Sequence, residues 1–246
     1  MKILILGGTT EASELLRLLA GQENLNVTMS LAGRTQTPVL PEVNCRIGGF
    51  GGALGLAEYI RENNINALVC ATHPFARKMP FNAAEAAEIA GIPLLFVLRP
   101  AWQAQAGDKW IEVDSHAQAL SSIRNPSSIF LTVGRLELAE YEAAQHHYYV
   151  VRSIDEVAEK TLKNSKYITS RPPFNVADER ELMISEKIDF VITKNSGGKA
   201  TEAKLVAARE LGIPVILINR PARPPENPNT PHVATAKEAR DWILAK

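Results

Sequence analysis

Short apolar runs alternate along the chain with segments whose apolar residues recur at helical spacing. The runs at 3–6, 67–71 and 92–97 are continuous and largely aliphatic, as expected for strands that are buried on both faces. Helical patterns at 83–91 and 200–212 each end in glycine. The order strand, helix, strand predicts right-handed crossovers, and therefore an α/β fold with doubly wound parallel sheets.

The pattern occurs twice. The stretch "AGIPLLFVLRPA" at 90–101 matches "LGIPVILINRPA" at 211–222, an offset of 121 residues. Downstream, 112–120 matches 232–240, and each copy places a short strand before an N-capping Ser or Thr and a helix. The opening strand "KILILGG" finds its counterpart in "SIFLTVGR" at 128–135. A duplicated unit of about half the chain explains these matches.

We therefore predict two similar Rossmann-like domains, residues 1–124 and 125–246, that face each other across a cleft. Ligands are expected there, at the carboxyl ends of the strands, because parallel sheets bind ligands at that edge. The duplication predicts two separate sheets, with the strands at 112–114 and 232–234 at equivalent edges. The sequence does not exclude an exchange of these edge strands between the halves.

Composition narrows the class of protein. The 27 Lys and Arg residues balance the 27 Asp and Glu residues, so no net field favours nucleic acid or a membrane surface. No apolar run approaches the roughly 20 residues of a membrane span, and no signal peptide pattern precedes the first strand. Cys45 and Cys70 lie in apolar runs without metal-ligand spacing and are expected to be free thiols. We expect a cytoplasmic monomer without a metal site.

The turn after the first strand is the first candidate site. Its residues precede a helix, and their backbone N–H groups and the positive helix end suit a phosphate. The dinucleotide fingerprint G-x-G-x-x-G is not met, so the turn is either a phosphate site or a tight connection. The candidate cofactor-binding residues in the turn are Gly7, Gly8, Thr9, Thr10 and Glu11.

The end of the second strand bears on the choice of cofactor. NAD-binding folds usually place an acid there to bind the ribose hydroxyls, whereas this chain has Ser30, Arg34 and Thr35. These side chains suit a 2′-phosphate, with Arg34 as the cation. If a nicotinamide cofactor binds, the pattern favours NADP over NAD, and the alternative is that Arg34 is an ordinary surface residue.

Further candidates follow the later strands. A glycine-rich edge at 48–52 allows a flat ligand to approach the backbone, and His73 is either a proton or hydrogen-bond donor or a structural histidine. The stretch "TKNSGGKAT" at 193–201 fails the P-loop spacing but can still bind an anion. The first copy contributes Gly49, Phe50, Gly51, Thr72, His73 and Arg77, and the second contributes Gly134, Arg135, Arg171, Lys194, Ser196, Gly197 and Gly198.

Cations are concentrated at these strand ends although the chain has no net charge. A substrate with many carboxylates would account for them. They are Arg34, Arg77, Lys78, Arg99, Arg135, Arg171, Lys194 and Arg220.

These same stretches resemble the precorrin-6A reductases of cobalamin biosynthesis over nearly the full length. The resemblance rests on "ILGGTTEA", "SLAGRT", "GGFGG", "ATHPFA", "TVGR", "SRPPF", "TKNSGG" with Thr201 and Lys204, and "IPVILINRP". It implies an NADPH-dependent oxidoreductase that adds a hydride and a proton across one double bond of precorrin-6A to give precorrin-6B. It also implies that two Rossmann-like domains hold the cofactor and the tetrapyrrole between them.

The resemblance divides the candidates by role. It assigns Gly7 to Glu11, Ser30, Arg34 and Thr35 to the cofactor, while Gly134, Arg135 and Ser196 to Gly198 reach either the cofactor or the macrocycle. The substrate-side candidates are His73, Arg77, Arg171 and Lys194, with Thr72 beside them, and the flat ring explains Gly49, Phe50 and Gly51. No catalytic residue is assigned, because the proton can come from water.

Two alternatives remain at this point. Related reductases of the anaerobic pathway act on the cobalt-containing ring, and two α/β lobes around a cleft also describe non-catalytic binding proteins of small ligands. The short-chain dehydrogenase mechanism is not supported, because Tyr141 and Tyr167 lack a Lys four residues later.

Overall fold

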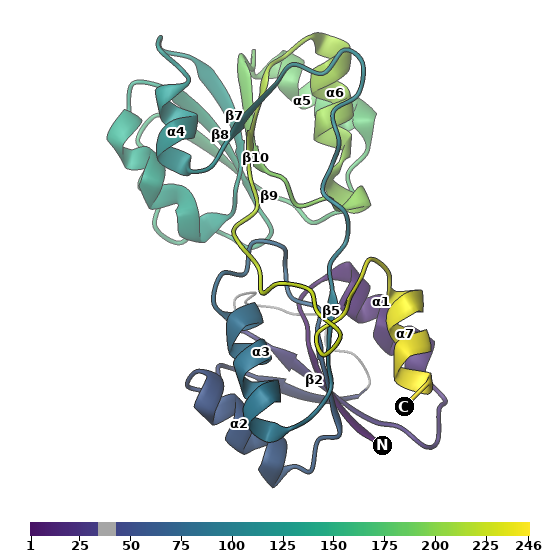
Figure 1. The fold of residues 1–246 in the computed structure, drawn as a ribbon. Helices are drawn as coiled ribbons and strands as arrows, with labels where there is room; N and C mark the ends of the chain where they lie inside the picture. Colours follow the sequence, from purple (N-terminus) through teal and green to yellow (C-terminus); the bar gives the residue numbers. More distant parts are fainter. Residues whose placement is uncertain (34–42) are drawn as a thin grey trace. The chain divides into compact units, whose positions relative to one another are not determined.

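The computed structural model describes residues 1–33 and 43–246, which form two compact units (Figure 1). Unit 1 comprises Met1–Pro100 and Pro221–Lys246, and unit 2 comprises Ala101–Arg220. Each unit contains a six-stranded sheet in which every pair of neighbouring strands is parallel. The predicted α/β class, with two similar doubly wound sheets, is confirmed.

The unit 1 sheet has the order β3-β2-β1-β4-β5-β12. This is the 3-2-1-4-5-6 order of dinucleotide-binding sheets, if β12 is counted as the sixth strand. Its central strands are fully buried because helices cover both faces. The strands are β1 (Lys2–Leu6), β2 (Asn26–Leu31), β3 (Asn44–Ile47), β4 (Ala67–Cys70), β5 (Leu94–Val97) and β12 (His232–Val233).

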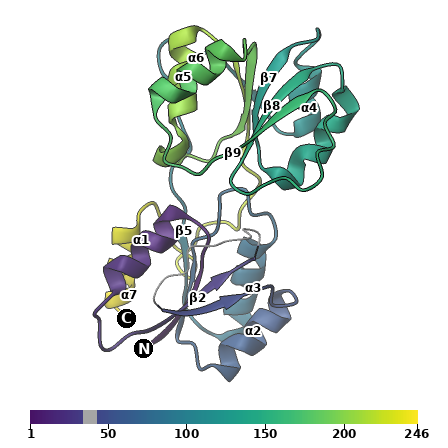
Figure 2. The same ribbon diagram turned by 180° about the vertical axis from the view of Figure 1, so that it is seen from behind.

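Two pairs of helices cover the unit 1 sheet, one pair on each face (Figures 1 and 2). On one face the apolar sides of the first and last helices bury Leu15 and Ile243. On the other face the middle helices bury Leu56 and Ala86. The first pair is α1 (Thr10–Leu19) with α7 (Ala236–Leu244), and the second is α2 (Ala53–Glu62) with α3 (Met79–Ala90).

Unit 2 repeats the design with the order β9-β8-β7-β10-β11-β6. Helices α5 and α6 cover one face around Phe130 and Leu217, and the segment that follows β7 is a 3₁₀ helix, η1, in place of an α-helix. The elements are β6 (Trp110–Val113), α4 (His116–Ser121), β7 (Ser128–Thr132), η1 (Arg135–Ala144), β8 (Tyr148–Ser153), β9 (Ser165–Thr169), α5 (Val176–Ser185), β10 (Phe190–Lys194), η2 (Lys199–Thr201), α6 (Ala203–Leu211) and β11 (Val215–Ile218).

Local chemistry fixes the helix ends as the sequence predicts. Ser115 and Thr235 lie at equivalent N-caps, where their hydroxyls accept hydrogen bonds from the third N–H of α4 and of α7. Gly91 and Gly212 end α3 and α6 in the left-handed conformation, at φ 69° and 67°. The two copies therefore share strand order and also the way in which their helices begin and end.

The predicted domain boundary at residues 124 and 125 is wrong, because the two halves exchange their sixth strands. β6 pairs with β11 in unit 2, and β12 pairs with β5 in unit 1. The chain passes from unit 1 to unit 2 after Pro100 and returns after Arg220, so both crossings fall in the repeated Arg-Pro-Ala sequence. An edge strand bonds to one neighbour only, and β5 and β11 belong to matching stretches of the repeat, so the sequence does not show which of the two each sixth strand joins.

Because the chain returns to unit 1 after Arg220, the last helix, α7, should stabilise unit 1. Ile243→Ala removes a side chain that is 1% exposed in the core shared with α1, and we expect the free energy of unfolding to fall by about 2–4 kcal/mol. Leu244→Ala is the matched control, because Leu244 is 50% exposed and its loss should cost less than about 0.5 kcal/mol. Urea unfolding followed by circular dichroism measures both, and equal effects would contradict the packing.

Candidate functional site

The first glycine turn lies at the switch point of the unit 1 sheet. β1 and β4 are parallel neighbours, and the connections that follow them lead to α1 on one face and α3 on the other, which is the arrangement that defines the switch point of such a sheet. The N–H of Gly7 donates to the Ser30 carbonyl at 2.9 Å. Across the switch point, Thr9 Oγ1 donates to the Ala71 carbonyl at 2.8 Å. The ends of β1, β2 and β4 are thereby fixed relative to one another.

Gly7 and Gly8 serve different purposes in this turn. A Cβ on Gly7 would lie 2.2 Å from Met29 Sδ, so Gly7 allows the turn to pack onto β2. Gly8 has φ 111°, a conformation that favours glycine, and a Cβ there would meet no atom of the described residues within 4 Å. The space above Gly8 is therefore open to a ligand, directly before the N-terminus of α1.

Glu11 of the predicted cofactor set has an ion-pair partner. Its carboxylate lies 2.7 Å from Arg99 Nη1, and both side chains are largely buried. Arg99 follows β5, so the sheet brings together two residues that are far apart in sequence. The pair neutralises a carboxylate that would otherwise repel an anion at the first turn of α1.

The ends of β2 and β3 meet through Arg46, which the sequence did not single out. Its guanidinium donates to Ser30 Oγ at 3.2 Å, to the Gly48 carbonyl at 2.9 Å and to the Gly49 carbonyl at 2.8 Å. It also stacks 3.8 Å from the centre of the Phe50 ring. Arg46 thus connects Ser30 with the glycine-rich edge that includes Gly51. The candidates Arg34 and Thr35 lie outside the described residues.

The end of β4 carries Thr72, His73 and Arg77. His73 Nδ1 accepts a hydrogen bond from the N–H of Phe75 at 3.2 Å, an assignment that places the proton of the neutral ring on Nε2. The His73 carbonyl accepts from Arg223 Nη2 at 2.8 Å, while Arg77 is exposed. The loop is therefore held by Arg223 of the returning segment, a residue that no sequence pattern singled out.

Burial governs the chemistry of the thiol at the end of β4. Desolvation raises the pKa of Cys70, although hydrogen bonds with Thr72 and the charge of Arg223 oppose this shift. Cys70 is a buried free thiol as predicted, and Cys45 is a half-buried one. A buried thiol with a raised pKa is a poor nucleophile.

The corresponding turn of unit 2, after β7, is built differently. Gly134 has φ 107°, but a Cβ there would lie 2.9 Å from Glu137 Oε2 and 3.7 Å from Lys194 Nζ. Glu137 and Lys194 form an ion pair at 3.0 Å, and Arg135 is half-buried beside them at the start of η1. A carboxylate over the turn and a 3₁₀ helix after it make this turn a weaker anion site than the Gly8 turn.

The remaining unit 2 candidates follow β9 and β10. Arg171 pairs with Asp155 at 2.9 Å. After β10, Arg220 donates to the carbonyls of Asn195 and Ser196 at 2.8 and 3.1 Å, which fixes the start of the Ser196 to Gly198 turn. Among the cations that the sequence assigned to a polycarboxylate ligand, the described residues Arg99, Arg171 and Lys194 therefore have acidic partners within the chain.

Lys204, at the start of α6, is a buried cation behind this turn. It is 3% exposed, its Nζ donates to the Thr201 carbonyl at 2.6 Å, and it lies 4.8 Å from the centre of the Trp102 ring. Burial lowers the pKa of Lys204 to about 7; the positive charge of Arg152 acts in the same direction, and the carboxylates of Glu179 and Glu202 act against it. Lys204 is therefore poised between its charged and neutral forms near neutral pH.

The strand ends thus hold the described candidates in two sets. In unit 1, Gly7 to Glu11, Ser30, Gly49 to Gly51, Thr72 and His73 lie at the carboxyl ends of β1 to β4. In unit 2, Gly134, Arg135, Arg171, Lys194 and Ser196 to Gly198 lie at the ends of β7, β9 and β10. The sequence placed each residue at the correct strand end, because strand ends can be identified from the pattern alone.

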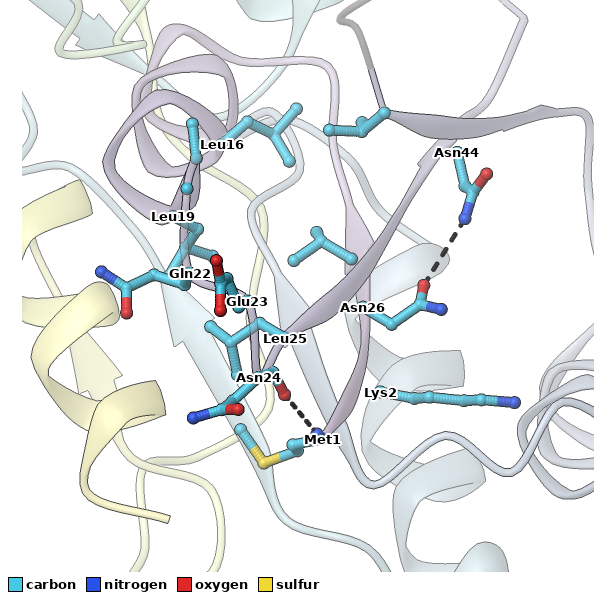
Figure 3. Close-up of a pocket in the computed structure, with 14 residues that line it drawn as sticks. Met1, Lys2, Leu16, Leu19, Gln22, Glu23, Asn24, Leu25, Asn26 and Asn44 are labelled. Carbon is cyan, nitrogen blue, oxygen red and sulfur yellow. Dashed lines mark hydrogen bonds between the residues drawn. The ribbon is translucent and has the colours of Figure 1, made fainter.

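A hollow of about 560 Å³ lies at the opposite edge of the unit 1 sheet (Figure 3). It surrounds the amino ends of β1, β2 and β3, where the amino group of Met1 donates to the Asn24 carbonyl at 2.6 Å and Asn44 bonds with Asn26 at 3.5 Å. Leu16 and Leu19 contribute apolar wall. No predicted site residue lines this hollow.

The sheet order and the open glycine turn at the switch point define a class: α/β oxidoreductases with a dinucleotide-binding fold. The chain belongs to the family described as precorrin-6x reductase CbiJ/CobK, whose model matches residues 2–244. It is an oxidoreductase of cobalamin biosynthesis that acts on a CH–CH group. This membership decides against the non-catalytic binding protein.

Individual relatives agree with the family. A precorrin-6A reductase from Sinorhizobium sp is 46% identical, over 98% of this chain and 92% of its own. A solved structure named CobK precorrin-6A reductase superposes with a TM-score of 0.92 at 40% identity, covering all of this chain and 96% of that one. A cobalt-precorrin-6A reductase from Priestia megaterium is 27% identical, over 89% of this chain and 90% of its own.

No helix within residues 1–33 and 43–246 is both long and apolar enough to cross a membrane. Within the same residues, no three His, Cys, Asp or Glu side chains gather in a group that could hold a metal ion.

The lowered pKa of Lys204 predicts a specific pH dependence of stability. Between about pH 7 and the ordinary lysine pKa of 10.5, the unfolded chain binds a proton at Lys204 that the folded chain has released. The free energy of unfolding should therefore rise with pH through this window, relative to a variant without the amine. In urea unfolding at pH 7, 8.5 and 9.5, the midpoint urea concentration of the wild type should rise relative to that of Lys204→Met at each higher pH.

The exposed Lys199 provides the control for this prediction. Lys199→Met should unfold in parallel with the wild type at all three pH values, because the Lys199 side chain is exposed to solvent in the folded protein and so loses little hydration on folding. A constant gap between wild type and Lys204→Met from pH 7 to 9.5 would show that Lys204 stays charged in the folded protein.

Proposed function

We propose that this protein reduces precorrin-6A to precorrin-6B with NADPH as the hydride donor. In this proposal, unit 1 binds the dinucleotide at the Gly8 turn, and basic and hydrogen-bonding side chains at the strand ends bind the carboxylates of the macrocycle. The observation that carries the proposal is the open turn at Gly8, on a sheet with the strand order of dinucleotide-binding proteins.

The contrast between the two glycine turns supports unit 1 as the dinucleotide site. At Gly8 the space is open, α1 begins directly afterwards, and Arg99 neutralises Glu11. At Gly134 the Glu137 carboxylate covers the turn. A pyrophosphate requires open space in front of the backbone N–H groups, and of the two turns only the Gly8 turn provides it. The candidate role of Gly134 and Arg135 then lies with the macrocycle.

The end of β2 supports NADPH over NADH. Asn26–Leu31 is followed by Ala32 and Gly33, so no carboxylate stands among the described residues at the position where NAD-binding folds bind the ribose hydroxyls. Ser30 instead receives a hydrogen bond from an arginine. By sequence, Arg34 and Thr35 directly follow Gly33.

The relatives favour the metal-free ring as the substrate. Identity to the precorrin-6A reductase of Sinorhizobium sp is 46%, against 27% to the cobalt-precorrin-6A reductase of Priestia megaterium. Among the substrate-side candidates, Arg77 is exposed, and no carboxylate of the described residues forms a salt bridge with it. At Arg171 and Lys194 a substrate carboxylate would compete with Asp155 and Glu137.

In the mechanism, the dinucleotide would supply the hydride, and the protein orients the reactants and provides the electrostatic environment. The Gly8 turn and the start of α1 would hold the pyrophosphate. His73, with its proton on Nε2, would donate a hydrogen bond rather than accept one. Because Arg223 and Phe75 fix the loop of His73, this donor is positioned before the ligands arrive.

Substitution of Gly8 tests the site. Gly8→Ala forces an L-residue into a φ of 111°, at a cost of about 1–2 kcal/mol, and places a methyl group in the space proposed for the pyrophosphate. We expect NADPH to bind at least about tenfold more weakly, measured by anaerobic fluorescence titration. Turnover of precorrin-6A and of cobalt-precorrin-6A by the wild type, followed by absorbance, tests the reaction and the substrate.

Gly21→Ala is the matched control for Gly8→Ala. Gly21 also has a positive φ, 81°, with no atom of the described residues near an added Cβ, but it follows α1 at the far end from the Gly8 turn. The two variants share backbone strain, so only a ligand at Gly8 separates them. Equal loss of NADPH affinity in both variants, or no turnover of either precorrin by the wild type, would refute the proposed function.

A further inference from the structure

If the dinucleotide binds in unit 1, the position of Arg46 places its guanidinium near the adenosine ribose. It is the third residue of β3 and pairs in register with Ser30 near the carboxyl end of β2. Paired residues of parallel neighbours project to the same side of a sheet, and Arg46 Nη1 indeed donates to Ser30 Oγ at 3.2 Å. A guanidinium therefore stands at the strand end that faces the adenosine ribose in dinucleotide-binding sheets.

The partners of Arg46 are all neutral. Its hydrogen bonds go to the Ser30 hydroxyl and to the carbonyls of Gly48 and Gly49, and its plane stacks on Phe50. Across residues 1–33 and 43–246, no carboxylate forms a salt bridge with it, unlike Arg99, which has Glu11. A half-buried charge with neutral partners only is incompletely compensated, and an anion would complete its environment.

Arg46 also retains hydrogen-bonding capacity. A guanidinium has five N–H donors, and three hydrogen bonds use two N–H groups of Nη1 and one of Nη2. No described residue accepts a hydrogen bond from the second N–H of Nη2 or from the N–H of Nε, so both are available to another acceptor. The Phe50 ring, 3.8 Å from the guanidinium carbon, and the two carbonyls fix the plane of the group, so little conformational entropy would be lost on binding.

We propose that Arg46 determines the preference for a phosphorylated dinucleotide by binding the 2′-phosphate of NADPH beside Ser30. This inference rests on the proposed function, because it requires the dinucleotide to lie in unit 1. A carboxylate at this strand end binds the two ribose hydroxyls of NAD, whereas a guanidinium attracts the additional charge of the 2′-phosphate. The ribose hydroxyls of NADH are neutral, so their attraction to the guanidinium of Arg46 is much weaker.

The test compares two dinucleotides in two arginine variants of the full chain. Arg46→Gln removes the charge, and we expect the Kd for NADPH to rise about thirtyfold, while the Kd for NADH changes less than about threefold. Competition with 2′,5′-ADP should weaken to the same extent as NADPH binding, and competition with 5′-AMP should not change. Arg46→Lys keeps the charge but loses the planar fork, so its preference for NADPH should fall between those of the wild type and Arg46→Gln.

Arg61→Gln is the control variant. Arg61, on α2, also donates to a backbone carbonyl, that of Ile89, so its loss imitates the structural part of losing Arg46. We expect both Kd values to remain at those of the wild type. If Arg46→Gln fails to fold, as judged by circular dichroism, the ratio of the two Kd values in Arg46→Lys decides the question.

The outcomes separate this inference from the proposed function. The wild type could prefer NADPH while Arg46→Gln loses affinity for NADPH and for NADH to the same degree. That result would show that Arg46 only holds the Gly48 to Phe50 loop, so the inference would fail while the proposed use of NADPH would stand. A wild type that binds neither dinucleotide would overturn the proposed function itself. Selective loss of NADPH and 2′,5′-ADP is the result that establishes the role of Arg46.

Discussion

At each of the two points where the chain enters the other unit, the residue after the repeated Arg-Pro-Ala sequence forms hydrogen bonds with a loop of the sheet that the chain enters. Trp102 exchanges two hydrogen bonds with the side chain of Asn195, after β10, and Arg223 donates to the carbonyl of His73, after β4. Trp102 and Arg223 occupy equivalent positions in the repeat, one residue beyond each Arg-Pro-Ala. These hydrogen bonds hold the chain in place where it enters each unit, before it forms the exchanged strand. The same hydrogen bonds hold the loops after β4 and β10, which carry candidate site residues.

The two copies have diverged in charge while they kept the same strand order. Unit 1 has an open glycine turn, a regular helix after it, and an acid neutralised by Arg99. Unit 2 has a glycine turn beneath Glu137, a 3₁₀ helix, and a buried lysine behind its next loop. A duplicated framework can therefore take on two binding tasks, because strand order specifies where a ligand lies, and the side chains at the strand ends specify which ligand is bound.

Much of the fold follows from local sequence, whereas the site does so only in part. The strands, the repeat and the caps at Ser115 and Thr235 are readable because each depends on neighbouring residues. The domain boundary was missed because an edge strand carries no local mark of the sheet it joins. The ion pairs of Arg99 and Lys194 were missed because their partners, Glu11 and Glu137, are distant in sequence, so paired cations looked the same as those available to a ligand.

The strand exchange also has a consequence for how the protein is made on the ribosome. All six strands of unit 2 have been synthesised by residue 218, whereas the unit 1 sheet lacks its sixth strand until residues 232 and 233 appear. A growing chain can therefore complete the second unit before the first, reversing the usual N-terminal-first order. During that interval β5 presents an unpaired edge, and a nascent chain with such an edge is open to pairing with β6, the nearest strand of its own sequence, or with another chain.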